Sequence, residues 1–146
     1  MRPEVYEYTP YYGTYVNQAP EGESIKAILT TQLHELTEFF RSIPEEKGEF
    51  RYADKKWTIK EVLLHIIDTE RIMAYRALCF ARKDETPLPG FDQDDYVPFS
   101  DATNRTMENL IEEWRAVRMA SITLFAYMPA DMLERMGTAS GNPFSV

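Results

Sequence analysis

The sequence lacks both a long hydrophobic run and a set of cysteines. Its apolar stretches are only a few residues long, whereas a helix that crosses a bilayer needs about 20 residues. The first six residues have no apolar segment typical of a signal or transit peptide, so we expect a cytoplasmic protein with no membrane partner. The single cysteine, Cys79, excludes an intramolecular disulfide and a cysteine-rich zinc site. Its apolar neighbours favour a packed thiol over a nucleophile.

Basic charge is also scarce. The 146 residues include 16 Lys and Arg against 24 Asp and Glu, a formal net charge of −8. No basic stripe reverses this sign locally, so a nucleic-acid partner is not expected. Apolar residues make up 44% and charged residues 27%, the composition of an ordinary soluble domain and not of a disordered chain. With no internal repeat, residues 1–146 are expected to form one domain.

Three segments have the periodicity of amphipathic helices. Apolar residues recur at steps of three and four over about 24–41, 58–82 and 106–128, the spacing that lines one face of an α-helix. The middle segment has the clearest start, because Thr58 and Glu61 are spaced as a capping box. Its apolar arc is wide, which predicts the most buried helix of an all-α bundle.

The other segments lack helical periodicity. Residues 1–20 hold five tyrosines interrupted by proline and glycine, and are predicted to form an extended arm packed along the domain. The connection over 83–104 is long enough to return along the bundle, so that the third helix runs parallel to the second. Its acidic run at 92–95 lacks EF-hand spacing, which favours a solvated loop over a calcium site. The final residues, 144–146, look like the approach to a fourth helix, with Ser145 as its N-cap.

Two charged side chains fall on faces that are predicted to be buried. Glu70 lies near the middle of the apolar arc of 58–82, and Arg118 lies on the inner face of 106–128, one helical turn from Trp114. An isolated charge in a protein core is unfavourable. We therefore expect Glu70 and Arg118 to form an ion pair between the two helices. A catalytic carboxylate is the alternative role for Glu70.

The two histidines differ in their position on the predicted helices. His65 borders the apolar arc, at the start of a polar seam that includes Asp68, Thr69 and Arg76, while His34 lies opposite an apolar face and is expected to be exposed. His65 is either a hydrogen-bonded core histidine or a metal ligand held by a neighbouring carboxylate. No pair of histidines has the spacing of a helical metal motif, and no nucleophile elbow, P-loop or dinucleotide fingerprint is present. No catalytic or cofactor-binding residue is assigned from these patterns.

Five stretches of the chain match a known pattern. The longest are KWTIKEVLLHIIDTER at 56–71 and PLPGFDQDDY at 87–96, and the others lie at 75–78, 113–118 and 137–143. Together they resemble the DinB-like superfamily of damage-inducible proteins and metal-dependent hydrolases, over nearly the whole chain. The resemblance implies a four-helix bundle with a long crossover between helices 2 and 3. The fourth helix of that bundle is absent from the printed sequence.

The resemblance also implies a chemistry. Many members bind a divalent metal, zinc or nickel, through three histidines, and His65 matches the first of these. The other two normally lie on the fourth helix and have no counterpart in the printed sequence. The implied function is a metal-dependent hydrolase or thiol S-transferase, in which the metal activates water or a low-molecular-weight thiol against a small-molecule substrate. The alternative is a non-catalytic helical protein with an incomplete metal site. We expect the chain to form a homodimer, which would cover its open inner faces.

Overall fold

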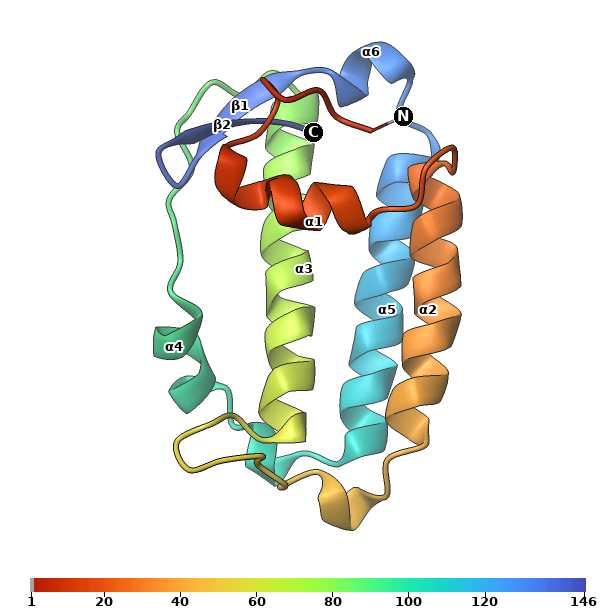
Figure 1. Cartoon of the computed structure of the whole chain (residues 1–146), viewed down its shortest axis with the longest axis vertical. Coiled ribbons are helices and arrows are strands. Elements are labelled where there is room, and N and C mark those ends of the chain that lie inside the picture. Colours follow the sequence, from red (N-terminus) through yellow and green to blue (C-terminus); the bar gives the residue numbers. More distant parts are fainter. Residues whose placement is uncertain (1) are drawn as a thin grey trace.

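Three long helices dominate the computed structural model, which describes residues 2–146 (Figure 1). They are α2 (Ile25–Arg41), α3 (Ile59–Ala81) and α5 (Met107–Ala126). α5 packs against both α2 and α3, and α2 runs antiparallel to the other two (Figure 1). Within the described residues, no helix combines the length and the apolar character that a membrane crossing requires.

The connection between α3 and α5 returns along the bundle, so these two helices run parallel, as predicted (Figure 1). It carries three short helical elements, which are α4 (Gln93–Tyr96), η3 (Val97–Phe99) and η4 (Ala102–Asn104). Another short turn, η2 (Glu45–Lys47), lies between α2 and α3. After α5 the described part of the chain contains no further long helix.

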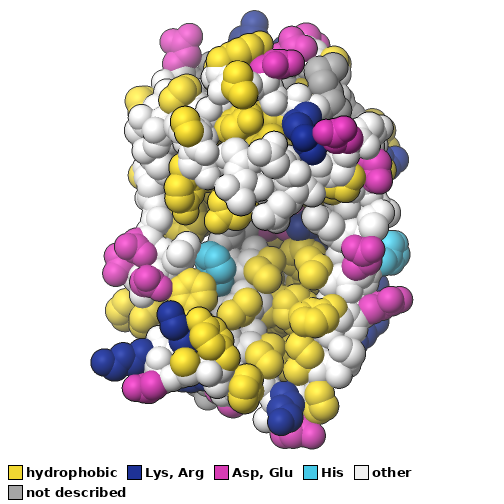
Figure 2. Space-filling view, in the orientation of Figure 1, with side chains coloured by type: hydrophobic (Ala, Val, Ile, Leu, Met, Phe, Trp, Pro, Cys, Tyr) yellow, Lys and Arg dark blue, Asp and Glu magenta, His cyan; other side chains and the backbone are white. Residues whose placement is uncertain are grey.

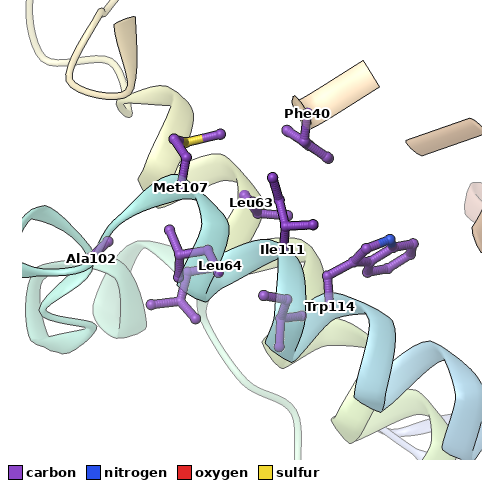
Figure 3. Close-up of a cluster of buried hydrophobic side chains, with 9 residues drawn as sticks. Phe40, Leu63, Leu64, Ala102, Met107, Ile111 and Trp114 are labelled. Atoms are coloured by element: carbon purple, nitrogen blue, oxygen red, sulfur yellow. The ribbon is translucent and has the colours of Figure 1, made fainter. Parts of the chain in front are cut away.

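The start of α3 and the core beneath it are specified locally. Oγ1 of Thr58 accepts a hydrogen bond from the backbone N–H of Glu61 at 3.1 Å, and Oε2 of Glu61 accepts one from the N–H of Thr58 at 2.6 Å. This confirms the predicted capping box. The main hydrophobic cluster brings together side chains of α2, α3, η4 and α5 (Figure 3), and Leu63, Leu110 and Trp114 are fully buried in it.

The prediction of a purely extended N-terminal arm is wrong. The arm contains the 3-10 turn η1 (Pro10–Tyr12) and the short helix α1 (Gly13–Gln18), which lies across the upper part of the bundle (Figure 1). Proline is compatible with the first turn of a helix, and Gly13 adopts helical dihedral angles here. The spacing of Tyr12 and Val16 places one side of α1 against the bundle.

The residues before the end of the given sequence form a hairpin, which the sequence patterns did not predict. β1 (Met136–Ala139) and β2 (Asn142–Ser145) form an antiparallel hairpin after the short helix α6 (Ala130–Leu133). Ser140 and Gly141, the two residues of its loop, both have positive φ, 52° and 73°, which suits a tight hairpin turn. The N–H of Ser145 donates a hydrogen bond to the carbonyl of Glu7 at 3.1 Å. The hairpin and the arm therefore hold each other in place.

Candidate functional site

A cavity of about 620 Å³, here called the arm cavity, lies between α3, α5, the N-terminal arm and the hairpin. Tyr8, Tyr12 and Tyr15 of the arm line one side of it, and Phe144 of β2 closes it near Tyr12, with the two rings 5.1 Å apart. α3 supplies the opposite wall through positions three or four residues apart, which are His65, Ile66, Thr69, Glu70, Met73, Ala74, Arg76, Ala77 and Phe80. The wall is mostly apolar, with a few charged groups at fixed places.

The predicted ion pair between α3 and α5 is present in the wall of the arm cavity. Nη2 and Nε of Arg118 donate to Oε2 of Glu70 at 2.7 and 2.9 Å, and Nη1 donates to Gln32 of α2 at 2.7 Å. The side chains of Arg118 and Glu70 are only 9% and 11% exposed. The pair therefore links all three long helices in a place that water scarcely reaches.

Two buried polar atoms at or near this pair lack a hydrogen-bond partner in the part of the chain that the structure describes. The guanidinium of Arg118 lies 4.4 Å from the centre of the Trp114 ring, a cation–π contact. Among residues 2–146, the buried atoms Oε1 of Glu70 and Nε1 of Trp114 have no hydrogen-bond partner. The ion pair thus forms a polar centre in an otherwise apolar layer, and one carboxylate oxygen is left without a donor.

His65 lies in the same wall, on the second turn of α3. Its ring is 4.9 Å from that of Trp57, and its Nδ1 is 3.4 Å from Oγ1 of Thr69. Burial lowers the pKa of the imidazole below its ordinary value, while the nearby carboxylates of Asp68 and Asp94 act in the opposite direction. A lowered pKa keeps the ring neutral at neutral pH, so that a nitrogen lone pair is available to a metal or to a hydrogen-bond donor.

The residues of the arm cavity do not form a metal centre by themselves. Across residues 2–146 no group of three or more His, Cys, Asp or Glu side chains is placed to hold a metal ion. Asp68 lies one turn from His65, and burial raises the pKa of its carboxyl against the opposing effect of Arg71. His34 is exposed on α2, as predicted. One imidazole does not fit a resident zinc or nickel, which takes at least three protein ligands.

Two other candidates from the sequence have structural roles. Cys79 is a buried free thiol that packs with Phe80 and Leu88, as predicted. The acidic run at 92–95 forms the start of α4, where Oδ1 of Asp92 accepts a hydrogen bond from the N–H of Asp94 at 2.9 Å. Neither belongs to the wall of the arm cavity.

A second hollow of about 760 Å³, here called the open groove, continues along the bundle between α2 and α3. Ile66 lines both the arm cavity and the open groove, so the two adjoin. Figure 2 shows hydrophobic side chains gathered over the lower half of this face, below α1. Phe39 and Val62 on the two sides of the groove are 57% and 38% exposed. Part of the inner face of the bundle is therefore uncovered in the described chain.

Two parts of the site were not predicted from the sequence. The first is the arm, whose tyrosines form one side of the cavity. The second is Arg76, which belongs to the polar seam that begins at His65 but is only 6% exposed. Its Nη2 donates to the carbonyl of Pro89 at 2.8 Å and to Oγ of Ser140 at 3.1 Å. Because these partners come from distant segments, periodicity along α3 could not indicate the burial of Arg76.

Comparison with known proteins places the chain in a family. A sequence model of the DinB superfamily matches residues 28–146, so the chain belongs to the DinB superfamily. A curated relative from Oceanobacillus iheyensis, named "Putative metal-dependent hydrolase OB0413", is 27% identical over 125 residues, which are 81% of this chain and 71% of the relative. The recognition made from the sequence motifs is thereby confirmed.

A solved structure shows the same fold. YfiT from Bacillus subtilis, described as a probable metal-dependent hydrolase with an unusual four-helix bundle topology, superposes with a TM-score of 0.69. The match covers 88% of this chain and 78% of YfiT at 14% sequence identity. At that identity the likeness shows the arrangement of the helices and leaves the chemistry to be argued from the residues of the cavity.

Proposed function

We propose that the protein acts as a metal-dependent hydrolase of the DinB type, in which His65 supplies one ligand of a divalent metal. The observation that carries this proposal is the place of His65. It is a partly buried imidazole, its pKa lowered by burial, in the wall of a 620 Å³ cavity, at the position that matches the first family histidine. The relatives described as metal-dependent hydrolases support the same class.

The remaining donors of such a metal lie outside residues 2–146, in a second copy or in further chain. Zinc and nickel are the expected metals, because imidazole nitrogen suits both. When bound, a divalent metal supplies an activated water, or a thiolate if the protein is an S-transferase. The cavity's own contribution is to hold an apolar substrate beside His65 and away from bulk water. A hydrolase needs only water as its second substrate, so we place it before the S-transferase.

Metal content tests the role of His65. We expect elemental mass spectrometry to find about one zinc or nickel per chain in protein that includes the source of the remaining donors, and almost none in His65→Ala. His34→Ala is the matched control, because it removes the other histidine from an exposed position on α2, and it is expected to keep its metal. Equal metal content in all three proteins, or no metal in any of them, would contradict the proposed ligand.

The open groove favours one alternative, a non-catalytic homodimer. Contiguous apolar surface of this kind is usually covered by a partner, and a second copy would cover it symmetrically. Light scattering at micromolar concentration is then expected to give the mass of two chains, and Phe39→Glu in the groove is expected to give one. Met119→Glu, an equally exposed apolar position on α5 outside the groove, serves as the control. A monomeric wild-type protein would rule out the dimer.

A further inference from the structure

We propose that Arg76 forms an anion-binding subsite of the arm cavity, for a small molecule with an apolar body and one carboxylate or phosphate group. That this molecule is a substrate rests on the proposed function. The binding itself requires no metal. The inference depends on the positive charge of Arg76, because this side chain is buried and has no carboxylate partner among the described residues.

Three cationic side chains are buried among residues 2–146, and Arg76 differs from the other two. Lys60 is 2.9 Å from Glu45 and Arg118 is 2.7 Å from Glu70. Arg76 is as buried as they are, at 6% exposure. Among the residues that the structure describes, no carboxylate lies within ion-pair distance of it.

The contacts of the Arg76 guanidinium are all neutral. Nη2 donates to the carbonyl of Pro89 at 2.8 Å and to Oγ of Ser140 at 3.1 Å, and Nη1 contacts only the sulfur of Met73 at 3.8 Å. The ring of Phe91 lies 5.8 Å from the guanidinium carbon. These contacts fix the side chain between the crossover and the hairpin. They satisfy Nη2, while other N–H donors of the guanidinium have no oxygen acceptor within residues 2–146.

A buried cation without a counter-charge is unfavourable, and its field is poorly screened. The two acidic side chains that line the arm cavity do not compensate for it. Glu70 is held by Arg118, and Glu7 accepts a hydrogen bond from the N–H of Glu4 within the arm. An anionic group of a ligand would supply the missing charge, and the planar guanidinium favours carboxylate or phosphate oxygens.

The surroundings of Arg76 define the rest of the ligand. The cavity wall near it is formed by apolar side chains, namely Met73, Ala77, Phe80, Phe144 and Val146. A fully ionic or sugar-like molecule would lose hydration there without compensation. Arg76 also lies eleven residues after His65 on α3, about 16 Å along the helix axis. A ligand held at Arg76 therefore reaches His65 only if its apolar body is elongated.

Calorimetry on the full 146-residue protein, treated with EDTA, tests the subsite. The probes are octanoate, octyl phosphate and 1-octanol, which share one apolar body and differ in the head group. We expect at least one of the two anions to bind about tenfold or more tightly than 1-octanol, the effect of a charge-assisted hydrogen bond. The stronger of octanoate and octyl phosphate identifies the head group.

Variants separate the charge of Arg76 from its structural contacts. Arg76→Gln is expected to bind the anions and 1-octanol equally, and Arg76→Lys to keep part of the preference. Arg115→Gln, an exposed arginine of α5 outside the cavity wall, is expected to behave as wild type. An unchanged preference in Arg76→Gln would overturn the proposal, and so would equal binding of all three probes by the wild type, which needs no variant to fold. Because metal is absent throughout, failure here is distinct from failure of the His65 metal site.

Discussion

Replacing Arg118 by methionine is expected to lower the free energy of unfolding by about 3–5 kcal/mol, the effect of removing one partner of a buried ion pair. Arg118 provides the charge and the donors that face Oε2 of Glu70. The other oxygen of Glu70 already lacks a partner within residues 2–146. Without Arg118, the whole carboxylate would be left in a nearly dry site. Urea unfolding followed by circular dichroism measures the loss.

Two further variants show whether burial causes this effect. In the double variant Glu70→Met/Arg118→Met both charges are gone, and most of the lost stability is expected to return, because apolar pairs often replace buried ion pairs without loss. Arg41→Met breaks the exposed pair with Glu108 and is expected to change stability by less than about 1 kcal/mol. If Arg118→Met were as mild as Arg41→Met, the pair would not be an important stabilising contact.

The helices and this ion pair could be predicted from the sequence because their causes are local. Steps of three and four residues define the inner face of each helix, and a capping box marks where α3 begins. Glu70 and Arg118 could be matched because each is a lone charge on an apolar face, and burial of either demands an opposite charge. Only the pairing itself is a long-range feature. It could be predicted because few charged residues lie on the inner faces of the helices.

The N-terminal arm and the hairpin, which line the arm cavity, could not be predicted in the same way. The hairpin was not predicted, although a two-residue loop with positive φ at Ser140 and Gly141 is typical of one. The docking of the arm depends on contacts between the ends of the chain, such as the hydrogen bond from Ser145 to Glu7. Such contacts leave no periodicity in either segment.

The functional residues of the site also differ in whether the sequence could indicate them. His65 was found because it borders an apolar face and matches a family position. The isolation of Arg76 is a property of its surroundings, since it depends on which residues of the crossover and the hairpin come near it. An arginine in a polar seam looks the same in the sequence whether an acid faces it or a cavity does.

Trp114 links the core to the polar centre of the site, and Trp114→Ala is expected to lower the free energy of unfolding by about 3–5 kcal/mol. The side chain is fully buried among α2, α3 and α5 (Figure 3), so its removal leaves a cavity that the rigid bundle cannot fill. It also removes the ring beneath the guanidinium of Arg118. Chemical denaturation with tryptophan-independent detection, such as far-ultraviolet circular dichroism, measures the change.

Trp114→Phe is the matched control, because it keeps an aromatic ring under Arg118 and removes the buried Nε1 that has no partner in the described chain. Its cost is expected to be clearly smaller than that of Trp114→Ala, because phenylalanine leaves a smaller cavity. Because Trp114 and Arg118 are in contact, the losses in Trp114→Ala and Arg118→Met are expected to be non-additive in the double variant. A loss in Trp114→Phe as large as in Trp114→Ala would contradict this explanation, because phenylalanine keeps an aromatic ring in the same place.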